Sequence, residues 1–134
     1  MNRRNCILIV DDNIDNLELA EILLHSEGYD VRVAQDASEA METLRYLRPD
    51  LILMDVQLPG MDGLELTRRL RRIPILDGVI IVALSAYAMT SDKANALEAG
   101  CDGYMTKPID TRTFPSTVRA FLDRSRAVSL NARP

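Results

Sequence analysis

The sequence predicts an α/β protein built on a parallel sheet, and three observations support this prediction. Short apolar runs of strand length recur along the chain, and segments with the apolar spacing of helices lie between them. Most of the apolar runs are continuous, which is typical of strands that are buried on both faces of a parallel sheet. No linker, repeat or low-complexity tract interrupts the alternation, so we expect one domain with helices on both faces of the sheet.

Five segments have the composition of strands. Four of them are largely apolar, whereas the second alternates apolar and polar residues and is therefore expected at an edge of the sheet. The five predicted strands cover residues 6–10, 30–34, 51–54, 79–84 and 103–106.

The first three helices are predicted from apolar residues three or four positions apart. The first stripe consists of Leu17, Ala20 and Leu24. The second begins after Asp36, a good N-cap residue, ends before Pro49, and consists of Ala37, Ala40, Met41, Leu44 and Leu47. Pro74 ends the third stripe, which consists of Leu66, Leu70 and Ile73.

The last two helices have weaker signals. Ala94 and Leu97 precede Gly100, which we expect to be the C-terminal cap of the fourth helix. The final helix must begin near Thr113, because Pro115 is tolerated only in a first turn. Its stripe consists of Phe114, Val118, Phe121 and Leu122. We predict a domain over residues 1–124, followed by a frayed tail over 125–134, where no pattern remains.

Composition narrows the class of protein. A chain of 134 residues buries roughly two thirds of its unfolded surface, so it needs neither a disulfide nor a metal to fold. Its net charge of -4 argues against a nucleic-acid surface. Cys6 and Cys101 lack the spacing of metal ligands and indicate a reducing compartment. Because the first apolar run is too short for a signal peptide or a membrane span, we expect a cytoplasmic protein that binds no membrane.

Polar residues gather where the predicted strands end. Asp11 and Asp12 follow the first strand, Asp55 the third, Ser85 the fourth and Lys107 the fifth. The carboxyl ends of parallel strands share one edge of the sheet, and ligands bind there. We expect a flavodoxin-like (βα)5 sandwich with strand order 2-1-3-4-5, in which these five side chains converge on one pocket.

Such a pocket suits phosphoryl transfer. Three adjacent carboxylates repel one another, and a hard divalent ion such as Mg²⁺ relieves this repulsion. In this arrangement Asp11 and Asp12 hold the metal, and a carboxylate oxygen of Asp55 attacks phosphorus to form an acyl phosphate. Lys107, Ser85 and nearby backbone amides then bind the phosphoryl oxygens, so that the site works by positioning and charge neutralisation.

Four segments, "ILIVDDN", "LILMDVQLPGMDGLEL", "LSAYAM" and "GYMTKPI", resemble the receiver domain of bacterial two-component response regulators. Each segment alone is a weak signal, but the set in this order is specific, and it covers residues 6–122. The resemblance implies that Asp55 is the phosphoacceptor. It also implies a Mg²⁺ ion bound by Asp12, by Asp55 itself, by the main-chain carbonyl of Gln57 and, through water, by Asp11.

The resemblance implies roles for three further residues. Ser85 and Tyr104 would be the two switch residues, and Lys107 would be the lysine whose bond to Pro108 is usually cis in this family. Ser85 stands where many members have threonine, so the hydroxyl is kept while the β-branch that restricts χ1 is lost.

The implied function is a phosphorelay switch. The phosphoryl donor would be a phosphohistidine on a sensor histidine kinase or a histidine phosphotransfer protein. No output domain follows in this sequence, so we expect signalling by contact of the fourth helix, fifth strand and last helix with a downstream protein. A dimer linked to phosphorylation is compatible with this scheme, and the only reactions catalysed would be the domain's own phosphorylation and dephosphorylation.

Three other functions are alternatives to a phosphorelay switch. An Asp-nucleophile phosphatase needs a second aspartate two residues after the nucleophile, where this chain has Gln57. A flavodoxin-like cofactor site needs a loop that accepts phosphate after the first strand, and "DDNIDN" would repel one. A receiver-shaped scaffold without phosphorylation stays open, and phosphorylation by a small phosphodonor would separate it from a switch.

Three remaining features have simpler interpretations. The basic run "RRLRR" at residues 68–72 is interpreted as a solvated helix face, since no aromatic residues are interleaved. His25 is interpreted as a solvated residue near a helix C-terminus rather than a phosphohistidine. Ile14 either contacts a phosphodonor, as that end of the helix does in the family, or packs locally at the helix start.

Overall fold

The computed structural model describes residues 4–86 and 89–131, with side chains described as far as residue 124. Residues 87–88 of the motif "LSAYAM" and 132–134 of the predicted tail lie outside the described residues. A five-stranded parallel sheet in the order β2-β1-β3-β4-β5 forms the centre, as predicted. The strands are β1 (Cys6–Val10), β2 (Asp30–Ala34), β3 (Leu51–Asp55), β4 (Ile80–Ser85) and β5 (Gly103–Thr106).

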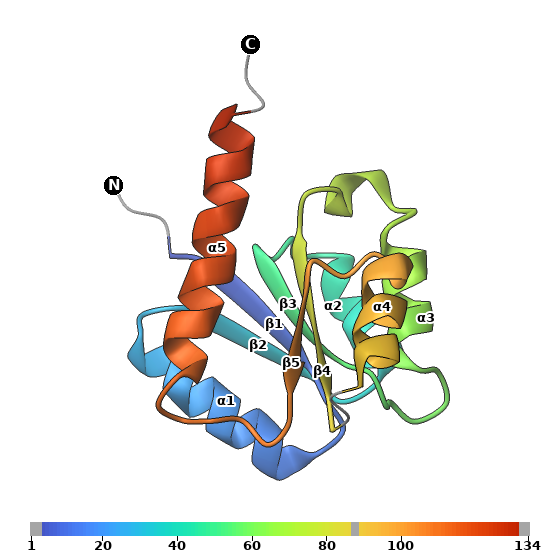
Figure 1. The fold of residues 1–134 in the computed structure, drawn as a ribbon, viewed down its shortest axis with the longest axis horizontal. Helices are drawn as coiled ribbons and strands as arrows, with labels where there is room; N and C mark the ends of the chain where they lie inside the picture. Colours follow the sequence, from blue (N-terminus) through green and yellow to red (C-terminus); the bar gives the residue numbers. More distant parts are fainter. Residues whose placement is uncertain (1–3, 87–88, 132–134) are drawn as a thin grey trace.

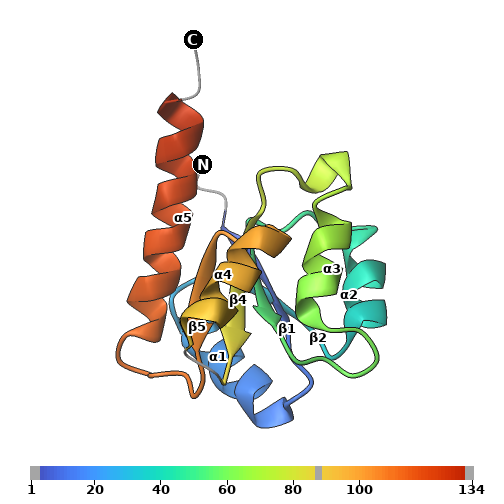
Figure 2. The same ribbon diagram turned by 45° about the vertical axis from the view of Figure 1, so that its right-hand side comes forward.

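Helices cover both faces of this sheet (Figure 1). One layer consists of α1 (Ile14–Ser26) and α5 (Phe114–Asn131), and the other of α2 (Ala37–Leu44), α3 (Gly63–Leu70) and α4 (Thr90–Ala99). Figure 2 shows α3 and α4 side by side over the second face. Because strands alternate their side chains between faces, each face of the sheet contributes to a separate buried core.

Local capping explains where the first three helices begin. The side chains of Asn13, Asp36 and Asp62 accept hydrogen bonds from backbone amides in the first turns of α1, α2 and α3. At the C-terminal end of α4, Gly100 adopts a left-handed conformation with φ of +112° and caps the helix as predicted. A short 3-10 helix, η1 (Pro74–Leu76), follows α3 and begins at Pro74, the residue predicted to end the third helix.

Two strands are shifted from their predicted bounds at the end where the polar groups gather. Asp55 and Ser85 are the last residues of β3 and β4 rather than the first residues after them. Asp55 lies opposite Leu84, and Ser85 lies opposite Thr106. Backbone pairing therefore continues through these residues whatever their side-chain polarity, and the sheet itself holds them.

The apolar stripes of α2 and α4 were partly mispredicted. In α2, Met41 is exposed, and Leu47 lies beyond the end of the helix. In α4 the predicted Leu97 is 57% exposed, and Ala96 and Ala99 are the buried residues. The predicted Ala94 is exposed as well, so burial in α4 depends on which side of the helix faces the sheet.

The last helix is longer than predicted. Pro115 lies in its first turn, as expected, but α5 continues to Asn131 instead of losing its helical structure from Ser125. No glycine or proline follows Pro115 before Pro134, so nothing in the local sequence terminates the helix earlier. In the described part of the chain, none of the helices has the length and apolar content that crossing a membrane requires.

Candidate functional site

Lys107 brings the carboxyl ends of three strands together. Its Nζ lies 3.0 Å from Oδ2 of Asp11 and 3.1 Å from Oδ2 of Asp55. The amide of Lys107 donates to the carbonyl oxygen of Ser85, which attaches this residue to the end of β4, and the Lys107–Pro108 peptide is cis. Burial alone would lower the pKa of Lys107, but the two carboxylates beside it raise the pKa instead. The ammonium is therefore held charged between two strand ends.

Asp55 is a buried carboxylate with one oxygen fixed and the other aimed at the lysine. Only 3% of the residue is exposed. Its Oδ1 accepts a hydrogen bond of 3.0 Å from the amide of Gln57, which fixes the orientation of the carboxylate. Burial raises the pKa of Asp55 to about 6, and Asp11 adds to this rise, while the Gln57 amide and Lys107 act in the opposite direction. Above that pH, Asp55 is an oriented anion.

The two acidic residues after β1 differ in exposure. Asp11 is 1% exposed and its Oδ1 accepts from the amide of Asn13, whereas Asp12 is exposed to solvent. Carboxylate oxygens of Asp11, Asp12 and Asp55 all lie within 4.8 Å of one another. Oδ2 of Asp11 is buried and makes no well-aligned hydrogen bond, although Lys107 is near. An oxygen-only cluster with an incompletely satisfied buried oxygen fits a hard divalent cation such as Mg²⁺.

The two expected switch residues lie on β4, which pairs with the strand of Asp55, and on β5, which pairs with β4. Ser85 is buried, and Tyr104 of β5 is half-buried and packs against the core beneath α2, α3 and α4. Tyr104 pairs with Ala83, two residues before Ser85 along β4, so Ser85 and Tyr104 face the same side of the sheet. Both side chains therefore belong to the layer that contains α4.

Gly63 is a structural requirement of the site that the sequence analysis missed. It begins α3, and its amide donates to the carbonyl oxygen of Val56, which closes the loop after Asp55. A Cβ on Gly63 would overlap the backbone carbonyl oxygen of Asp55 and would press on the Met54 side chain. The Asp-Gly pair at 62–63 was a usable signal, since a glycine just inside a helix start indicates a close approach of the backbone rather than a helix end.

The other sequence interpretations have mixed outcomes. His25 is exposed in the last turn of α1, as expected, and Ile14 is an exposed residue at the start of that helix. Arg68 and Arg69 form the predicted solvated face and pair with Glu65. Arg71, in the same basic run, is instead half-buried and fully engaged by hydrogen bonds.

Comparison with known proteins decides between the families that could present such a site. The model of the response regulator receiver domain family matches residues 7–119. The chain belongs to this family. It is a receiver domain of two-component response regulators, and hence a signalling domain rather than an enzyme of the usual kind.

Relatives include proteins of similar length and longer ones. The polar-differentiation response regulator DivK of Brucella anthropi is 37% identical over 116 residues, which make up 87% of this chain and 94% of DivK. The DNA-binding response regulator MtrA of Mycolicibacterium smegmatis is 43% identical over 122 residues, 91% of this chain. The chain spans about half of MtrA, since the match covers 52% of that protein.

Solved structures agree with the fold of this receiver domain. A putative response regulator from Chloroflexus aurantiacus superposes with a TM-score of 0.85 at 34% identity, over 91% of this chain and all of its own (100%). A CheY-like receiver domain protein from Methanospirillum hungatei has the same TM-score of 0.85 at 30% identity, over 93% of this chain and 98% of its own. The predicted flavodoxin-like architecture is thus confirmed.

Proposed function

We propose that this receiver domain accepts a phosphoryl group on Asp55 and that the modified domain signals through contact with another protein. The observation that carries the proposal is the placement of the Asp55 carboxylate. It is buried and oriented by the Gln57 amide, and its Oδ2 lies 3.1 Å from the ammonium of Lys107. A carboxylate held in this way is a positioned nucleophile beside a fixed positive charge.

The reaction needs little more than this positioning. With a phosphohistidine donor, Oδ2 of Asp55 forms the new P–O bond while the P–N bond breaks, and the electron pair of that bond stays on the imidazole nitrogen. Lys107 then lies beside the phosphoryl oxygens and neutralises part of their charge, as phosphoryl transfer requires. The donor would be a sensor histidine kinase or a histidine phosphotransfer protein, in the cytoplasm.

The acidic cluster supports a role for Mg²⁺. Asp12 and Asp55 would bind the ion directly, with the main-chain carbonyl of Gln57, and Asp11 would bind it through water. When bound, the ion supplies charge neutralisation for the phosphoryl oxygens and for the three carboxylates. Asp12 is suited to direct binding because it is exposed, whereas one oxygen of Asp11 is already engaged by Asn13.

The proposed output surface consists of α4, β5 and α5. Ser85 would turn toward a phosphoryl group on Asp55, and Tyr104 would respond on the same side of the sheet. Exposed apolar residues on α4, Met89 at its start and Leu97, give this surface partner-binding character. Differential binding of the phosphoryl group to two side-chain arrangements would shift the population between them.

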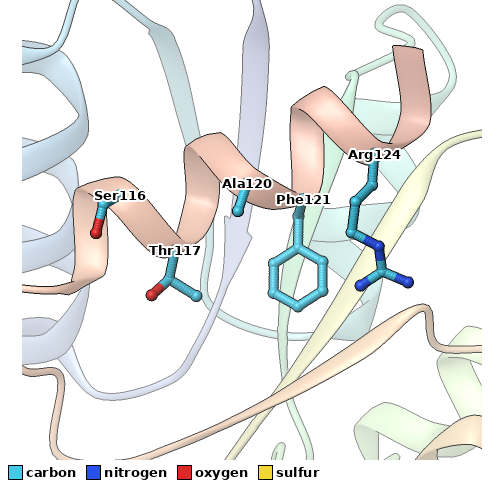
Figure 3. Close-up of a pocket in the computed structure, with 5 residues that line it drawn as sticks. All are labelled: Ser116, Thr117, Ala120, Phe121 and Arg124. Atoms are coloured by element: carbon cyan, nitrogen blue, oxygen red, sulfur yellow. The ribbon is translucent and has the colours of Figure 1, made fainter. Parts of the chain in front are cut away.

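The α5 part of this surface contains a shallow hollow (Figure 3). Phe121 packs directly onto Gly103 of β5, and the guanidinium of Arg124 lies 5.4 Å from the centre of its ring. The hollow is lined by Ser116, Thr117, Ala120, Phe121 and Arg124. An apolar floor with one cation at its rim is suited to a downstream protein or to a second copy of the phosphorylated domain.

The test of this proposal is phosphorylation by a small donor. Acetyl phosphate with Mg²⁺ should add one phosphoryl group to the wild-type protein, and Asp55→Asn should add none, because an amide is not a nucleophile for phosphorus. Intact mass spectrometry measures the addition. Full modification of Asp55→Asn would refute the assignment of Asp55, and failure to modify the wild type would favour an unphosphorylated scaffold.

A further inference from the structure

Arg71 holds together three elements at the amino edge of the sheet, opposite the acidic cluster. It lies just after α3, and its three guanidinium nitrogens each donate a hydrogen bond of 2.8 Å. The acceptors are the carbonyl oxygens of Gly100 and Val79 and Oδ2 of Asp102. The same Asp102 oxygen also accepts from the amide of Ile81 in β4. Such charge-assisted bonds are stronger than those between neutral groups.

The helix α4 ends inside this arrangement. Gly100, its C-terminal cap, receives the Arg71 side chain so closely that a Cβ at that position would lie 2.7 Å from Cγ of Arg71. The guanidinium also places a positive charge on the carbonyl end of the helix, where the helix dipole favours it. Both buried residues of α4, Ala96 and Ala99, lie in this last part of the helix.

The opposite end of α4 lacks comparable attachments within the described residues. Its N-cap residue, Met89, makes no side-chain capping bond, unlike Asn13, Asp36 and Asp62 at the starts of α1, α2 and α3. Met89 is 66% exposed, and residues 90–95 contribute no buried side chain. This end of α4 follows β4 in the chain, and the last residue of β4 is Ser85, at the same edge of the sheet as Asp55.

We propose that Arg71 and Asp102 anchor the C-terminal end of α4, so that a change at Asp55 moves α4 as a lever about Gly100 instead of shifting the whole helix. The lever part rests on the proposed function, because it needs modification of Asp55. Arg71 is in this sense a positioning residue: it touches neither Asp55 nor Lys107, and it determines which part of α4 can respond.

The anchor is tested first in the unmodified protein by hydrogen exchange of single amides. Arg71→Lys keeps the charge but cannot make three directed bonds, and it should speed exchange of the Gly100, Cys101 and Asp102 amides about tenfold. Arg68→Lys, on the exposed face of the same helix, is the matched control and should leave these rates unchanged. Unchanged rates in Arg71→Lys, or an equal acceleration in α1, would overturn the anchor.

The lever is tested with beryllofluoride and Mg²⁺, a mimic of the aspartyl phosphate. In the wild type, amide shift changes in α4 should be largest from Thr90 to Lys93 and should decline toward Gly100, whereas in Arg71→Lys they should extend to Gly100. An even change along α4 in the wild type, or the wild-type gradient in Arg71→Lys, would overturn the proposal. Fluorine NMR reports the adduct separately, and its absence in the wild type would refute phosphorylation of Asp55 itself.

Discussion

The two edges of the sheet use the same residue types in opposite ways. At the amino edge, Asp50 Oδ2 accepts a 2.7 Å hydrogen bond from the amide of Cys6, and Asp102 Oδ2 accepts from Ile81 and Arg71. These partners are distant in the sequence, so each carboxylate fastens one strand to another. At the carboxyl edge, Asp11 and Asp55 each accept from a backbone amide two residues further along their own loops, and both also lie within 3.1 Å of the Lys107 ammonium.

The two edges differ in the partners of the second oxygen of each carboxylate. A local backbone amide orients Oδ1 of Asp11 and Oδ1 of Asp55. The Oδ2 atoms of both residues lie beside the ammonium of Lys107. Burial raises the pKa of Asp55 and the nearby charge of Asp11 adds to this rise, so keeping the carboxylate ionised costs free energy of folding. The amino edge therefore contributes to stability, whereas the carboxyl edge keeps reactive groups at some expense to it.

The largest expected change in stability comes from adding a Cβ at Gly63, where the loop after Asp55 is tightly packed. Gly63→Ala should lower the free energy of unfolding by about 3 kcal/mol, because the new Cβ overlaps the Asp55 carbonyl oxygen and the loop must move. Urea unfolding measures the change. The neighbouring Asp62→Ala, which removes an N-cap, is the control and should cost about 1 kcal/mol. Wild-type stability in Gly63→Ala would show that the loop is not closed this tightly.

The second prediction concerns pH and the strained carboxylate. The folded-state pKa of Asp55, about 6, is above its ordinary value of 3.8, so the fold favours the protonated form. The contribution of Asp55 to stability should therefore be lost as pH rises through this window, by roughly 3 kcal/mol in total. Without Mg²⁺, Asp55→Asn should gain stability relative to wild type between these two values and keep a constant difference above them. A difference independent of pH, in urea unfolding, would contradict the raised pKa.

At the amino edge, we expect a smaller change in stability and no change in phosphorylation. Asp50→Ala leaves the amide of Cys6 without its acceptor and should cost about 1.5 kcal/mol, while phosphorylation by acetyl phosphate stays at the wild-type level. Asp50→Asn keeps an oxygen acceptor and should recover part of the loss. Asp77→Ala, at an exposed position whose carbonyl oxygen binds the side chain of Arg48, is the control for charge removal. Loss of phosphorylation in Asp50→Ala without loss of stability would contradict the view that the amino edge has a purely structural role.

The smallest expected effect sharpens the account of the metal. Mg²⁺ that binds only the folded state raises the melting temperature by mass action. Asp12→Asn should reduce this rise and should slightly raise the melting temperature without metal, since repulsion within the cluster is relieved. Thermal unfolding with Mg²⁺ and with EDTA measures both. The same Mg²⁺ response in Asp12→Asn and wild type would exclude Asp12 as a ligand.

Patterns along the chain were enough to predict the alternation of strands and helices, the edge position of β2 and the caps at Asp36 and Gly100. They also brought Asp11, Asp12, Asp55 and Lys107 to one edge, because parallel strands end together. These predictions hold because periodicity and capping depend on neighbouring residues. The ends of β3 and β4 were placed one residue too early, since side-chain polarity says little about where backbone pairing stops.

Tertiary structure alone decided the roles of residues whose partners are distant in sequence. Arg71 belongs to a basic run that looks uniformly solvated, yet it binds Gly100, Val79 and Asp102. Leu97 has the stronger apolar side chain, yet Ala96 is the residue that faces the core. In the same way, the sequence predicts a reactive role for Asp55, but it does not indicate that Asp50, just before the same strand, accepts a hydrogen bond from the amide of Cys6. Which carboxylate oxygen accepts from an amide and which faces Lys107 depends on strands that meet only in the folded chain.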